Sequence, residues 1–365
     1  MSIILGIESS CDETAAAVVK NGREVLSSCV ASQIAAHAPH GGVVPELAAR
    51  EHLKALNPVV SGALKDAGIT MAEVDAVAVT QGPGLIPALL VGLSYAKGLA
   101  IGHDKPLIGV NHFLAHIYGA FLKEGEFDNL FRPETYPLLA LVVSGGHTSL
   151  MLIDSDGSAR QLGCTIDDAA GEALDKGAKL LGLGYPGGPV IQKRGALGDE
   201  KRYNFPRPLT GAAGKALSPE LKYSFSFSGI KTALLYHARS CGVGENTPSA
   251  DEQWVNDTAA SYQQAVVDVL VKKTVTAARD FKVKTIVLAG GVACNRVLRE
   301  TLNAKTPRGV RFMAAPPAFC TDNAAMVGGI GYFHYLNRDF LDLSADSFAR
   351  LPQITRIPFV PEISK

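Results

Sequence analysis

The sequence predicts an α/β protein built from two similar halves. Short apolar runs rich in β-branched residues alternate with long helical patterns, as strands and helices do in α/β folds. Two hairpin-like segments stand far apart, at 4–19 and 141–152, and each is a strand, a polar turn and a second strand. One such hairpin in each half is typical of a duplicated, two-lobed nucleotide-binding fold. The 365 residues, of which 47% are hydrophobic, can form one large core or two lobes of ordinary size.

The individual elements can be placed along the chain from their patterns. Apolar runs bounded by glycine or serine predict strands at 3–6, 15–19, 76–80, 138–143, 149–153 and 285–288. Helical periodicity predicts helices at 32–67, 86–100, 172–181, 250–280 and 295–303. The first of these helices can break at Gly41, Gly42 and Pro45, because glycine and proline both disfavour a helix interior.

The same pattern suggests two lobes and a tail. We place the first lobe at 1–134 and the second at 135–340, and a helix around 323–337 can pack back on the first. Residues 195–228 are expected to form a surface insertion, whose 211–221 segment has no assigned role. The tail at 341–365 is polar and broken by proline, which predicts an extended strap. Basic residues of the insertion are candidate phosphate contacts: Lys201, Arg202, Arg207, Lys215 and Lys222.

Composition narrows the functional classes. Thirty-five basic and 35 acidic residues give zero net charge, so any nucleic acid must be bound by a local patch or with a partner's help. Six cysteines form no CxxC pair, which argues against a zinc knuckle or a disulfide scaffold. The longest apolar stretch, at 85–101, is broken by Pro87, Ser94 and Lys97. We therefore expect no membrane association and, without a targeting segment, a cytoplasmic protein.

The turn of the first hairpin, Ser9-Ser-Cys-Asp-Glu-Thr14, carries hydroxyl and acidic side chains. Hydroxyls and backbone N–H groups in a tight turn can hold phosphate oxygens, and Asp12 or Glu13 can hold a metal or a water molecule. A plain hairpin turn with polar residues remains the alternative.

Two glycine turns are further candidate ligand sites. In Val143-Ser-Gly-Gly-His-Thr148, glycine lets the backbone approach a ligand closely. Ala289-Gly-Gly-Val-Ala-Cys-Asn-Arg296 joins a strand to a helix, so the helix N-terminus can bind an anion and Asn295 can cap the helix or contact the ligand. Ordinary turns are the alternative, but three such loops in one chain favour ligand binding.

Asn111-His-Phe-Leu-Ala-His116 places His112 and His116 four residues apart, on one face of a helix. Together with Asp322, which lies in the polar segment Cys320-Thr-Asp-Asn323, they form a two-histidine, one-carboxylate set that suits Fe(II) or Zn(II). A structural pair of helix histidines is the alternative. A peptidase is disfavoured, because the general base of an HExxH site is replaced here by Phe113.

Taken together, these motifs resemble the family of tRNA threonylcarbamoyladenosine biosynthesis transferases, known in bacteria as TsaD and formerly called O-sialoglycoprotein endopeptidases. Ten stretches match in the family's order over about the first nine-tenths of the chain: 6–14, 41–46, 82–85, 112–116, 143–148, 166–172, 185–189, 225–229, 289–292 with Asn295, and 320–323. The resemblance implies an actin-like ATPase fold of the ASKHA, ribonuclease H-like type. It also implies transfer of a threonylcarbamoyl group from threonylcarbamoyl-AMP to N6 of adenosine 37 in tRNAs reading ANN codons.

Residue by residue, the resemblance places one divalent metal, with Fe(II) favoured over Zn(II), on His112, His116 and Asp322. It places the adenylate on Val142, Val143, Ser144, Gly145, Gly146, Asp175, Gly188 and Asn295. Many members carry an aspartate a few residues after Pro189, where this chain has Gln192, so the resemblance does not extend to that nucleoside contact. We assign the general base to Asp12 or Glu13 as a hypothesis.

The resemblance also implies partners: the anticodon loop of tRNA, a paralogous actin-like subunit (TsaB-like) and a small P-loop ATPase (TsaE-like). Two alternatives remain open from the residues. One is a carbamoyl-adenylate transferase acting on another acceptor, and the other is an actin-like ATP-binding scaffold, which would turn over ATP without depending on the histidine pair.

Overall fold

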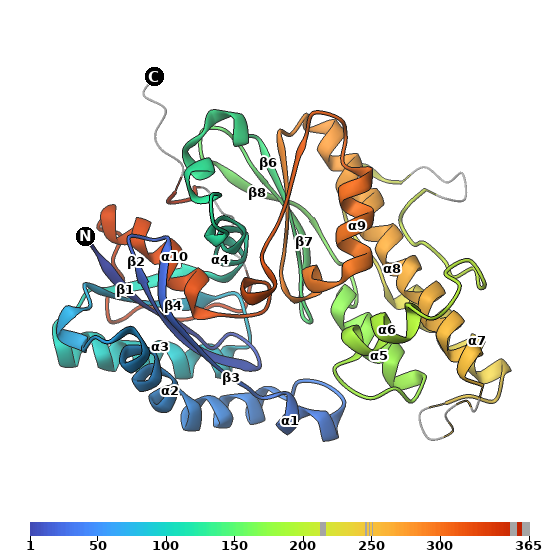
Figure 1. The fold of residues 1–365 in the computed structure, drawn as a ribbon, viewed down its shortest axis with the longest axis horizontal. Coiled ribbons are helices and arrows are strands. Elements are labelled where there is room, and N and C mark those ends of the chain that lie inside the picture. Colours follow the sequence, from blue (N-terminus) through green and yellow to red (C-terminus); the bar gives the residue numbers. More distant parts are fainter. Residues whose placement is uncertain (212–216, 245–246, 248, 250, 351–355, 360–365) are drawn as a thin grey trace. The chain divides into compact units, whose positions relative to one another are not determined.

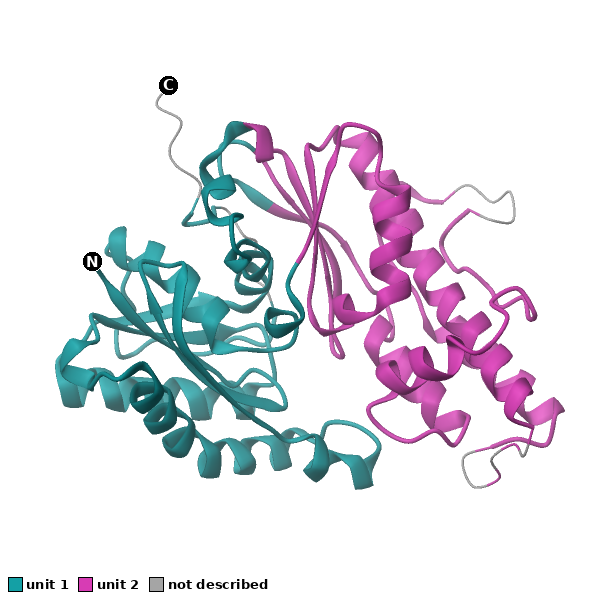
Figure 2. Ribbon diagram, in the orientation of Figure 1, with its two compact units in different colours: residues 1–133, 155–159, 315–365 teal, residues 134–154, 160–314 magenta. Residues whose placement is uncertain are grey.

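The structure is a computed structural model that describes residues 1–211, 217–244, 247, 249, 251–350 and 356–359. It divides into two compact units (Figure 2). Unit 1 comprises Met1–Pro133, Ser155–Ala159 and Ala315–Lys365, and unit 2 comprises Glu134–Asp154 and Arg160–Ala314. The first boundary falls beside the expected one. The expected second boundary lies at 340, whereas the chain returns to unit 1 from Ala315 onward, and the helix expected around 323–337 packs there.

Unit 1 contains a five-stranded mixed sheet in the order β3-β2-β1-β4-β5. Strands β1, β2, β3 and β4 of this sheet are labelled in Figure 1. Strand β1 pairs antiparallel with β2 and parallel with β4, while β3 and β5 complete the edges. The strands are β1 Ile3–Glu8, β2 Glu13–Lys20, β3 Glu24–Ser32, β4 Ala76–Gly82 and β5 Leu107–Asn111.

Helices cover both faces of this sheet because successive side chains of a strand point to opposite faces. Alternate residues Ala16 and Val18 of β2 pack with α2 Pro45–Ala67 and α3 Ile86–His103. Their neighbours Ala15, Ala17 and Val19 pack instead against α10 Ala324–Leu336. The short helix α4 His112–Gly119 follows β5 directly and packs against α10.

Helix α10 packs against β1 so closely that backbone atoms of the two elements are in contact at Gly6. A Cβ atom added to Gly6 would lie 2.3 Å from the Ala324 carbonyl oxygen and 2.6 Å from the Gly328 nitrogen. No side chain larger than hydrogen fits between the strand and the helix at this point.

Helix α3 is the one helix in the described part of the chain that is long and apolar enough to cross a membrane. It nevertheless packs against α2 and β4, with Leu93, Ala96 and Ala100 in the core of unit 1. A core helix passes the same test of length and composition, and one face of α3 is packed in the core of unit 1 while Leu90 and Ile101 are exposed.

Unit 2 repeats the sheet of unit 1 strand for strand, in the order β8-β7-β6-β9-β10. Strand β6 pairs antiparallel with β7 and parallel with β9, as β1 pairs with β2 and β4. The strands are β6 Leu138–Val143, β7 Thr148–Ile153, β8 Ala159–Cys164, β9 Thr285–Ala289 and β10 Arg311–Ala314. The repeated hairpin read from the sequence is therefore confirmed, and with it the duplicated α/β fold.

The helices of unit 2 are α5 Ala170–Leu180, α6 Gly187–Gly195, α7 Ser228–Ser240, α8 Glu252–Asp280 and α9 Arg296–Lys305. Helix α8 is central, because α6, α7 and α9 pack on it and it contacts β6.

The expected insertion at 195–228 runs along α8 rather than standing free of it. Backbone N–H groups of Asp199 and Tyr203 donate to side chains of α8, and Arg207 and Lys222 pair with Asp268 and Asp280 of that helix. These two cations are engaged within the chain, which weakens them as phosphate contacts. Lys215 and residues 212–216 of the 211–221 segment lie outside the described residues.

Several expected elements differ from those observed. The helix expected at 32–67 does break: Ser32 ends β3, α1 covers Ile34–His37, and α2 begins at Pro45. Strands β3, β5, β8 and β10 and helices α6 and α7 were not predicted. Beyond α10 the described tail is extended, and its Leu341 and Phe348 N–H groups donate to the carbonyls of Leu107 and Gln81 in unit 1.

Candidate metal centre and nucleotide turns

The histidine pair is presented by a short helix that starts immediately after a strand. The Asn111 side chain accepts hydrogen bonds from the N–H groups of Phe113 and Leu114, at 3.0 and 3.2 Å, and so caps α4. The helix begins at His112, and the four-residue spacing places His112 and His116 on the same face. Both imidazoles are buried, with 3% and 1% of their surface exposed.

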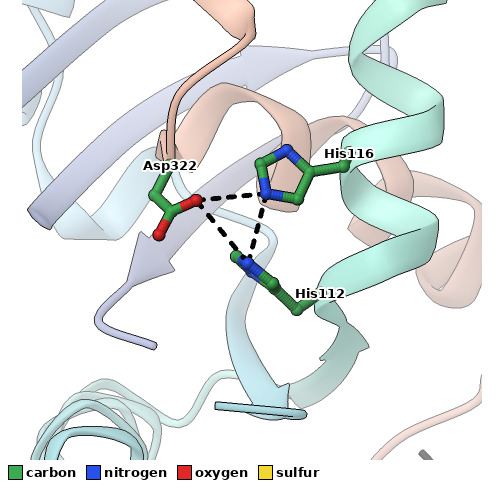
Figure 3. Close-up of side chains that lie close together, drawn as sticks. All are labelled: His112, His116 and Asp322. Carbon is green, nitrogen blue, oxygen red and sulfur yellow. Dashed lines mark hydrogen bonds and ion pairs between the residues drawn. The ribbon is translucent and has the colours of Figure 1, made fainter. Parts of the chain in front are cut away.

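Asp322 belongs to the segment just before α10 and lies against the face of α4 that carries the two histidines. Its Oδ1 atom lies 3.1 Å from His116 Nε2 and 3.6 Å from His112 Nε2, and the two Nε2 atoms are 3.2 Å apart (Figure 3). In the part of the chain that the structure describes, this is the one group of three or more His, Cys, Asp and Glu side chains placed to hold a metal ion.

The donor set and the spacing both fit a divalent metal. Two ligands of a tetrahedral ion, each about 2.0–2.1 Å from it, lie roughly 3.3 Å apart, which is close to the three distances in this triangle. Two neutral imidazole Nε2 atoms that face each other can share only one proton, whereas a metal ion accepts the lone pairs of both. The three residues therefore fit the ion that the sequence predicts for them.

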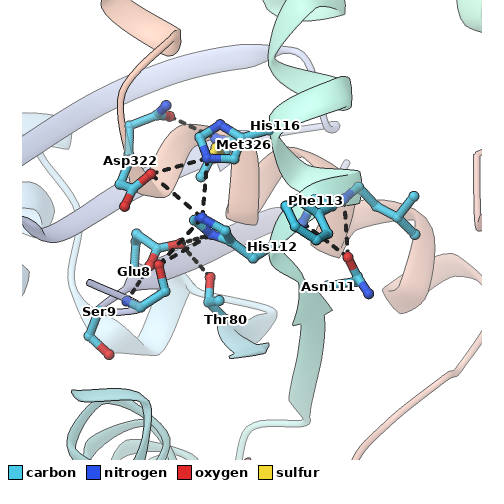
Figure 4. A network of polar contacts seen from close by, with 12 residues as sticks. Glu8, Ser9, Thr80, Asn111, His112, Phe113, His116, Asp322 and Met326 are labelled. Atoms are coloured by element: carbon cyan, nitrogen blue, oxygen red, sulfur yellow. Dashed lines mark hydrogen bonds and ion pairs between the residues drawn. The ribbon is translucent and has the colours of Figure 1, made fainter. Parts of the chain in front are cut away.

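Glu8 is a member of this centre that the sequence reasoning missed. Its fully buried carboxylate lies 3.1 Å from His112 Nδ1 and accepts hydrogen bonds from Thr80 Oγ1 at 2.6 Å and Ser10 N at 2.5 Å (Figure 4). A carboxylate on Nδ1 directs Nε2 of His112 toward the other two ligands. The signal in the sequence was an acidic residue ending an otherwise apolar strand.

The electrostatics of the centre favour positive charge. Burial alone would lower the pKa of His112, but Glu8 and Asp322 raise it to about 9. Burial likewise opposes ionisation of Glu8, and the charge and hydrogen bond of His112 hold the pKa of Glu8 below its ordinary value. The same carboxylates would stabilise a cation bound between the imidazoles.

The acidic turn between β1 and β2 adjoins this charge. Burial, followed by the Asp322 carboxylate, raises the pKa of Asp12. Burial, assisted by Asp12 and Asp322, raises the pKa of Glu13 to about 7 against the opposing hydrogen bond from Ser32. Among the described atoms, Glu13 Oε2 is buried without a hydrogen-bond partner. A carboxyl group with a pKa near 7 can exchange protons at neutral pH.

In unit 2, the glycine turn that follows β6 rests on the N-terminus of α5. Ser144 closes the turn by bonding to His147, and the N–H of Glu172 donates to the Gly145 carbonyl at 3.1 Å. A Cβ atom added to Gly145 or Gly146 would meet nothing within 4 Å. Packing therefore does not require glycine here, and the backbone of the turn is open to a ligand.

The other predicted adenylate residues lie on elements joined to this turn. Asp175 accepts a hydrogen bond from Gly187 N at 2.7 Å, which connects α5 to the start of α6, and a Cβ added to Gly188 would make only an ordinary 3.9 Å contact with Leu174. Gly290 packs directly on Val143, the last residue of β6, and Val142 precedes it in the strand.

Asn295 is engaged in the fold through both ends of its amide. Its oxygen caps α9 by accepting from Leu298 N, and its nitrogen donates to Gln263. Gln192, where many relatives were expected to carry an aspartate, accepts a hydrogen bond from Arg296 N and so ties α6 to α9. The elements carrying the predicted residues are thus connected, and Asn295 has a structural role in addition to any ligand contact.

Comparison with known proteins identifies the family. The family model described as tRNA N6-adenosine threonylcarbamoyltransferase, TsaD, matches residues 24–329. The chain belongs to this family. Relatives that carry the same name include those of Symbiobacterium thermophilum, which is 52% identical over 94% of this chain and 95% of the relative, and Thermomicrobium roseum, which is 49% identical over 97% and 98%.

A solved structure extends the likeness to the fold. Component A of the (R)-2-hydroxyglutaryl-CoA dehydratase of Acidaminococcus fermentans superposes with a TM-score of 0.52 at 15% identity, covering 91% of this chain and 98% of its own. The two repeated sheets are those of the actin-like fold expected from the resemblance. As a TsaD-family member, the chain is a transferase that acts on tRNA.

Proposed function

We propose that this chain transfers the threonylcarbamoyl group of threonylcarbamoyl-AMP to N6 of adenosine 37 in tRNAs that read ANN codons. The observation that carries the proposal is the family match over residues 24–329, which includes His112, His116 and Asp322 and the two glycine turns of unit 2. In this reaction a C–N bond forms at N6, the bond between the acyl carbon and the phosphate oxygen breaks, and AMP leaves.

The reaction requires mainly that the protein position the N6 amine and the acyl carbonyl correctly. The acyl group is already activated as a mixed anhydride, but the N6 amine is a poor nucleophile because its lone pair is delocalised into the adenine ring. The protein must hold the amine against the carbonyl and stabilise the charge that develops on oxygen. The adenine must also be splayed out of its stack, which an anticodon loop permits.

The proposed cofactor is one divalent ion on His112, His116 and Asp322. Two imidazoles and one carboxylate that leave coordination positions open are the ligand set of Fe(II) enzymes, and we therefore favour iron. The same three ligands also suit Zn(II). When bound, the ion supplies Lewis-acid stabilisation of oxygen charge. The 3.1 Å contact of Glu8 with His112 Nδ1 supports this proposal, because a carboxylate on Nδ1 directs Nε2 toward the other two ligands.

The proposed base is a carboxylate of the acidic turn, which accepts the proton that N6 releases. Glu13 is the better candidate of the two, because its pKa of about 7 matches neutral conditions and one of its oxygens is buried without a partner. Asp12, whose pKa is raised as well, is the second candidate.

The proposed adenylate site is the open turn of unit 2 with its neighbouring elements. Backbone N–H groups in a glycine turn can bind phosphate oxygens without a side chain intervening. The space around Gly145, Gly146 and Gly188 supports this assignment. We extend it to Val142, Val143, Ser144, Asp175 and Asn295.

We further propose the setting in which the protein works. The family resemblance supports a paralogous actin-like partner (TsaB-like), a small P-loop ATPase (TsaE-like) and a cytoplasmic location. Tight binding of the anticodon loop by a chain of zero net charge needs a local basic surface or the partner's help.

The test is to incubate the purified protein and its partners with synthetic threonylcarbamoyl-AMP and unmodified tRNA. We expect threonylcarbamoyladenosine at position 37 and one AMP per transfer, measured by nucleoside mass spectrometry. A tRNA with guanosine at position 37 is the matched control and should remain unmodified. Consumption of the adenylate with adenosine 37 untouched would instead indicate a transferase with another acceptor, and ATP turnover alone would indicate a scaffold.

A further inference from the structure

A buried chain of hydrogen bonds, separate from the metal triangle, connects two distant parts of unit 1. It consists of the side chains of His37, Gln33 and His52, which are 0%, 5% and 0% exposed. It begins at the N–H of Val44 and ends at the carbonyl of Cys11, in the turn that carries Asp12 and Glu13. We call these three side chains the relay. They lie outside the residues assigned to the reaction.

The direction of each bond in the relay follows from its first donor. The backbone N–H of Val44 can only donate, so Nδ1 of His37 accepts it at 3.3 Å. The other ring nitrogen, Nε2, then carries the proton and donates to Gln33 Oε1 at 3.1 Å.

The second half of the relay is fixed in the same way. The Gln33 amide nitrogen donates to His52 Nδ1 at 3.3 Å, and the Thr14 hydroxyl donates to the same atom at 2.7 Å. Nε2 of His52 is therefore protonated and donates to the Cys11 carbonyl at 3.0 Å. Every ring in the relay is neutral, and burial lowers the pKa of both histidines, which keeps them so.

The relay fixes the backbone on which the two candidate bases stand. His52 holds the carbonyl of Cys11, and the backbone N–H of Gln33 holds the next carbonyl, that of Asp12, at 3.0 Å. Regular pairing of β2 with β3 begins only at Glu13 opposite Ser32. Two consecutive carbonyls of the turn are thus bound from outside the hairpin, one of them by a side chain of α2.

We propose that His52 is a positioning residue for the transfer reaction, which acts by donating a hydrogen bond to the Cys11 carbonyl and so holds the carboxyl groups of Asp12 and Glu13 in place. The inference rests on the proposed function, because it takes one of these carboxyls as the base. It also gives the 41–46 motif a role, since the Val44 N–H fixes the tautomer of His37, the first member of the relay.

Two substitutions at position 52 distinguish the loss of the hydrogen-bond donor, Nε2 of His52, from the loss of the acceptor, Nδ1. In His52→Gln, the glutamine side chain, which is longer than asparagine, can place its amide nitrogen near the former Nε2 and keep the bond to Cys11. In His52→Asn, the amide oxygen can replace Nδ1 as acceptor, but the donor to Cys11 is lost. His237→Asn in unit 2, which loses a 3.3 Å contact with Thr258 Oγ1, is the matched control for removing an imidazole.

We expect His52→Asn to lower kcat about tenfold or more, since small misplacements of catalytic groups have effects of this size, with KM for the adenylate and metal content unchanged. Hydrogen exchange of the peptide covering Ser9–Thr14, measured without substrate, should become faster. His52→Gln should restore most of kcat and of the protection, and His237→Asn should change neither.

The inference is overturned if His52→Asn keeps wild-type kcat and wild-type exchange, or if its loss of kcat merely follows a loss of folded protein or of metal. Should His52→Asn not fold, Gln33→Met serves instead: it removes one of the two donors to His52 Nδ1, the other being the Thr14 hydroxyl, and it must lower kcat and speed exchange in the same peptide. An inactive wild-type protein would refute the proposed function, whereas an active wild type with an equally active variant refutes only the role of His52.

Discussion

The two units of this protein have the same sheet topology, but the turns of their first hairpins carry different kinds of residue. In unit 1, β1 ends in a buried carboxylate, Glu8, and its turn carries two further acids. In unit 2, β6 ends in the apolar Val143, and its turn contains two glycines around which a side chain would meet nothing. A repeated scaffold can therefore present side-chain chemistry at one turn and bare backbone at the other.

This difference has an energetic reason. Buried charges are tolerated only where partners compensate for the lost hydration, and unit 1 provides them for Glu8 through His112, Thr80 and Ser10. An open glycine turn needs no such compensation, because water hydrates its N–H groups until a ligand replaces it. We expect unit 1 to be sensitive to changes of charge and the turn of unit 2 to changes of size.

The largest effect in the comparison of the two units is expected from removing a ligand of the proposed metal in unit 1. His116→Ala should abolish stoichiometric metal binding and lower transfer by roughly 10³-fold, since several kcal/mol of charge stabilisation are lost. Elemental analysis of the purified protein and single-turnover transfer measure the two effects. Full metal content together with normal turnover would refute the metal centre.

The acidic turn should show the next largest effect. Glu13→Gln should lower kcat by about 10²-fold while the adenylate still binds, as expected for loss of a general base. A base must be deprotonated to act, so the wild-type rate should rise with pH through about 7, the value to which the pKa of Glu13 is raised. The variant should lack this rise. If Asp12→Ala alone suppresses transfer and abolishes the pH dependence, the base is Asp12.

Glu8 offers a smaller and more specific effect. Glu8→Gln keeps the size of the side chain but removes the charge that faces His112 Nδ1, so metal affinity should fall by about 10–100-fold. Titration with Zn(II) or Fe(II) measures this directly. Thr80→Val, which removes one hydrogen bond to the same carboxylate, should have a weaker effect in the same direction.

The glycines of unit 2 should show the smallest effect on stability and a selective one on binding. Gly145→Ala should leave thermal unfolding unchanged and raise KM for the adenylate about tenfold, because space is available in the protein but is needed by the ligand. Gly187→Ala is the matched control: its Cβ would lie 2.5 Å from the Asp175 Cα, so the variant should lose about 1–3 kcal/mol of stability. Equal stability losses in both variants would contradict an open turn.

The sequence predicted those parts of the fold that depend on local patterns. The i, i+4 spacing of His112 and His116 is a property of one helix, and strand β6 was predicted with its observed bounds because all six of its residues are apolar and buried. Strand β3 was missed because it is an edge strand with no apolar alternation: its one buried residue is Ser27, whereas Val30 is exposed.

Contacts between distant residues could not be predicted in this way. Nothing near Arg207 in the sequence indicates that Asp268 neutralises it, and nothing near Glu8 indicates His112. Asp322 was predicted to join the histidines because the donor set needed a third ligand, because Asp322 lies in the polar segment 320–323, and because the family resemblance places the metal on it. The structure adds the reason: the packing of α10 against α4 brings that segment to the helix face.

The contact between Gly6 and the start of α10 has a practical consequence for reading mutant data. Asp322 stands two residues before α10, so anything that lifts this helix from β1 also withdraws the carboxylate from the imidazoles. A single methyl group at position 6 would therefore abolish metal binding at the proposed centre while all three proposed ligands remained chemically intact. Loss of bound metal in a variant identifies a ligand only when the spacing between strand and helix has been preserved.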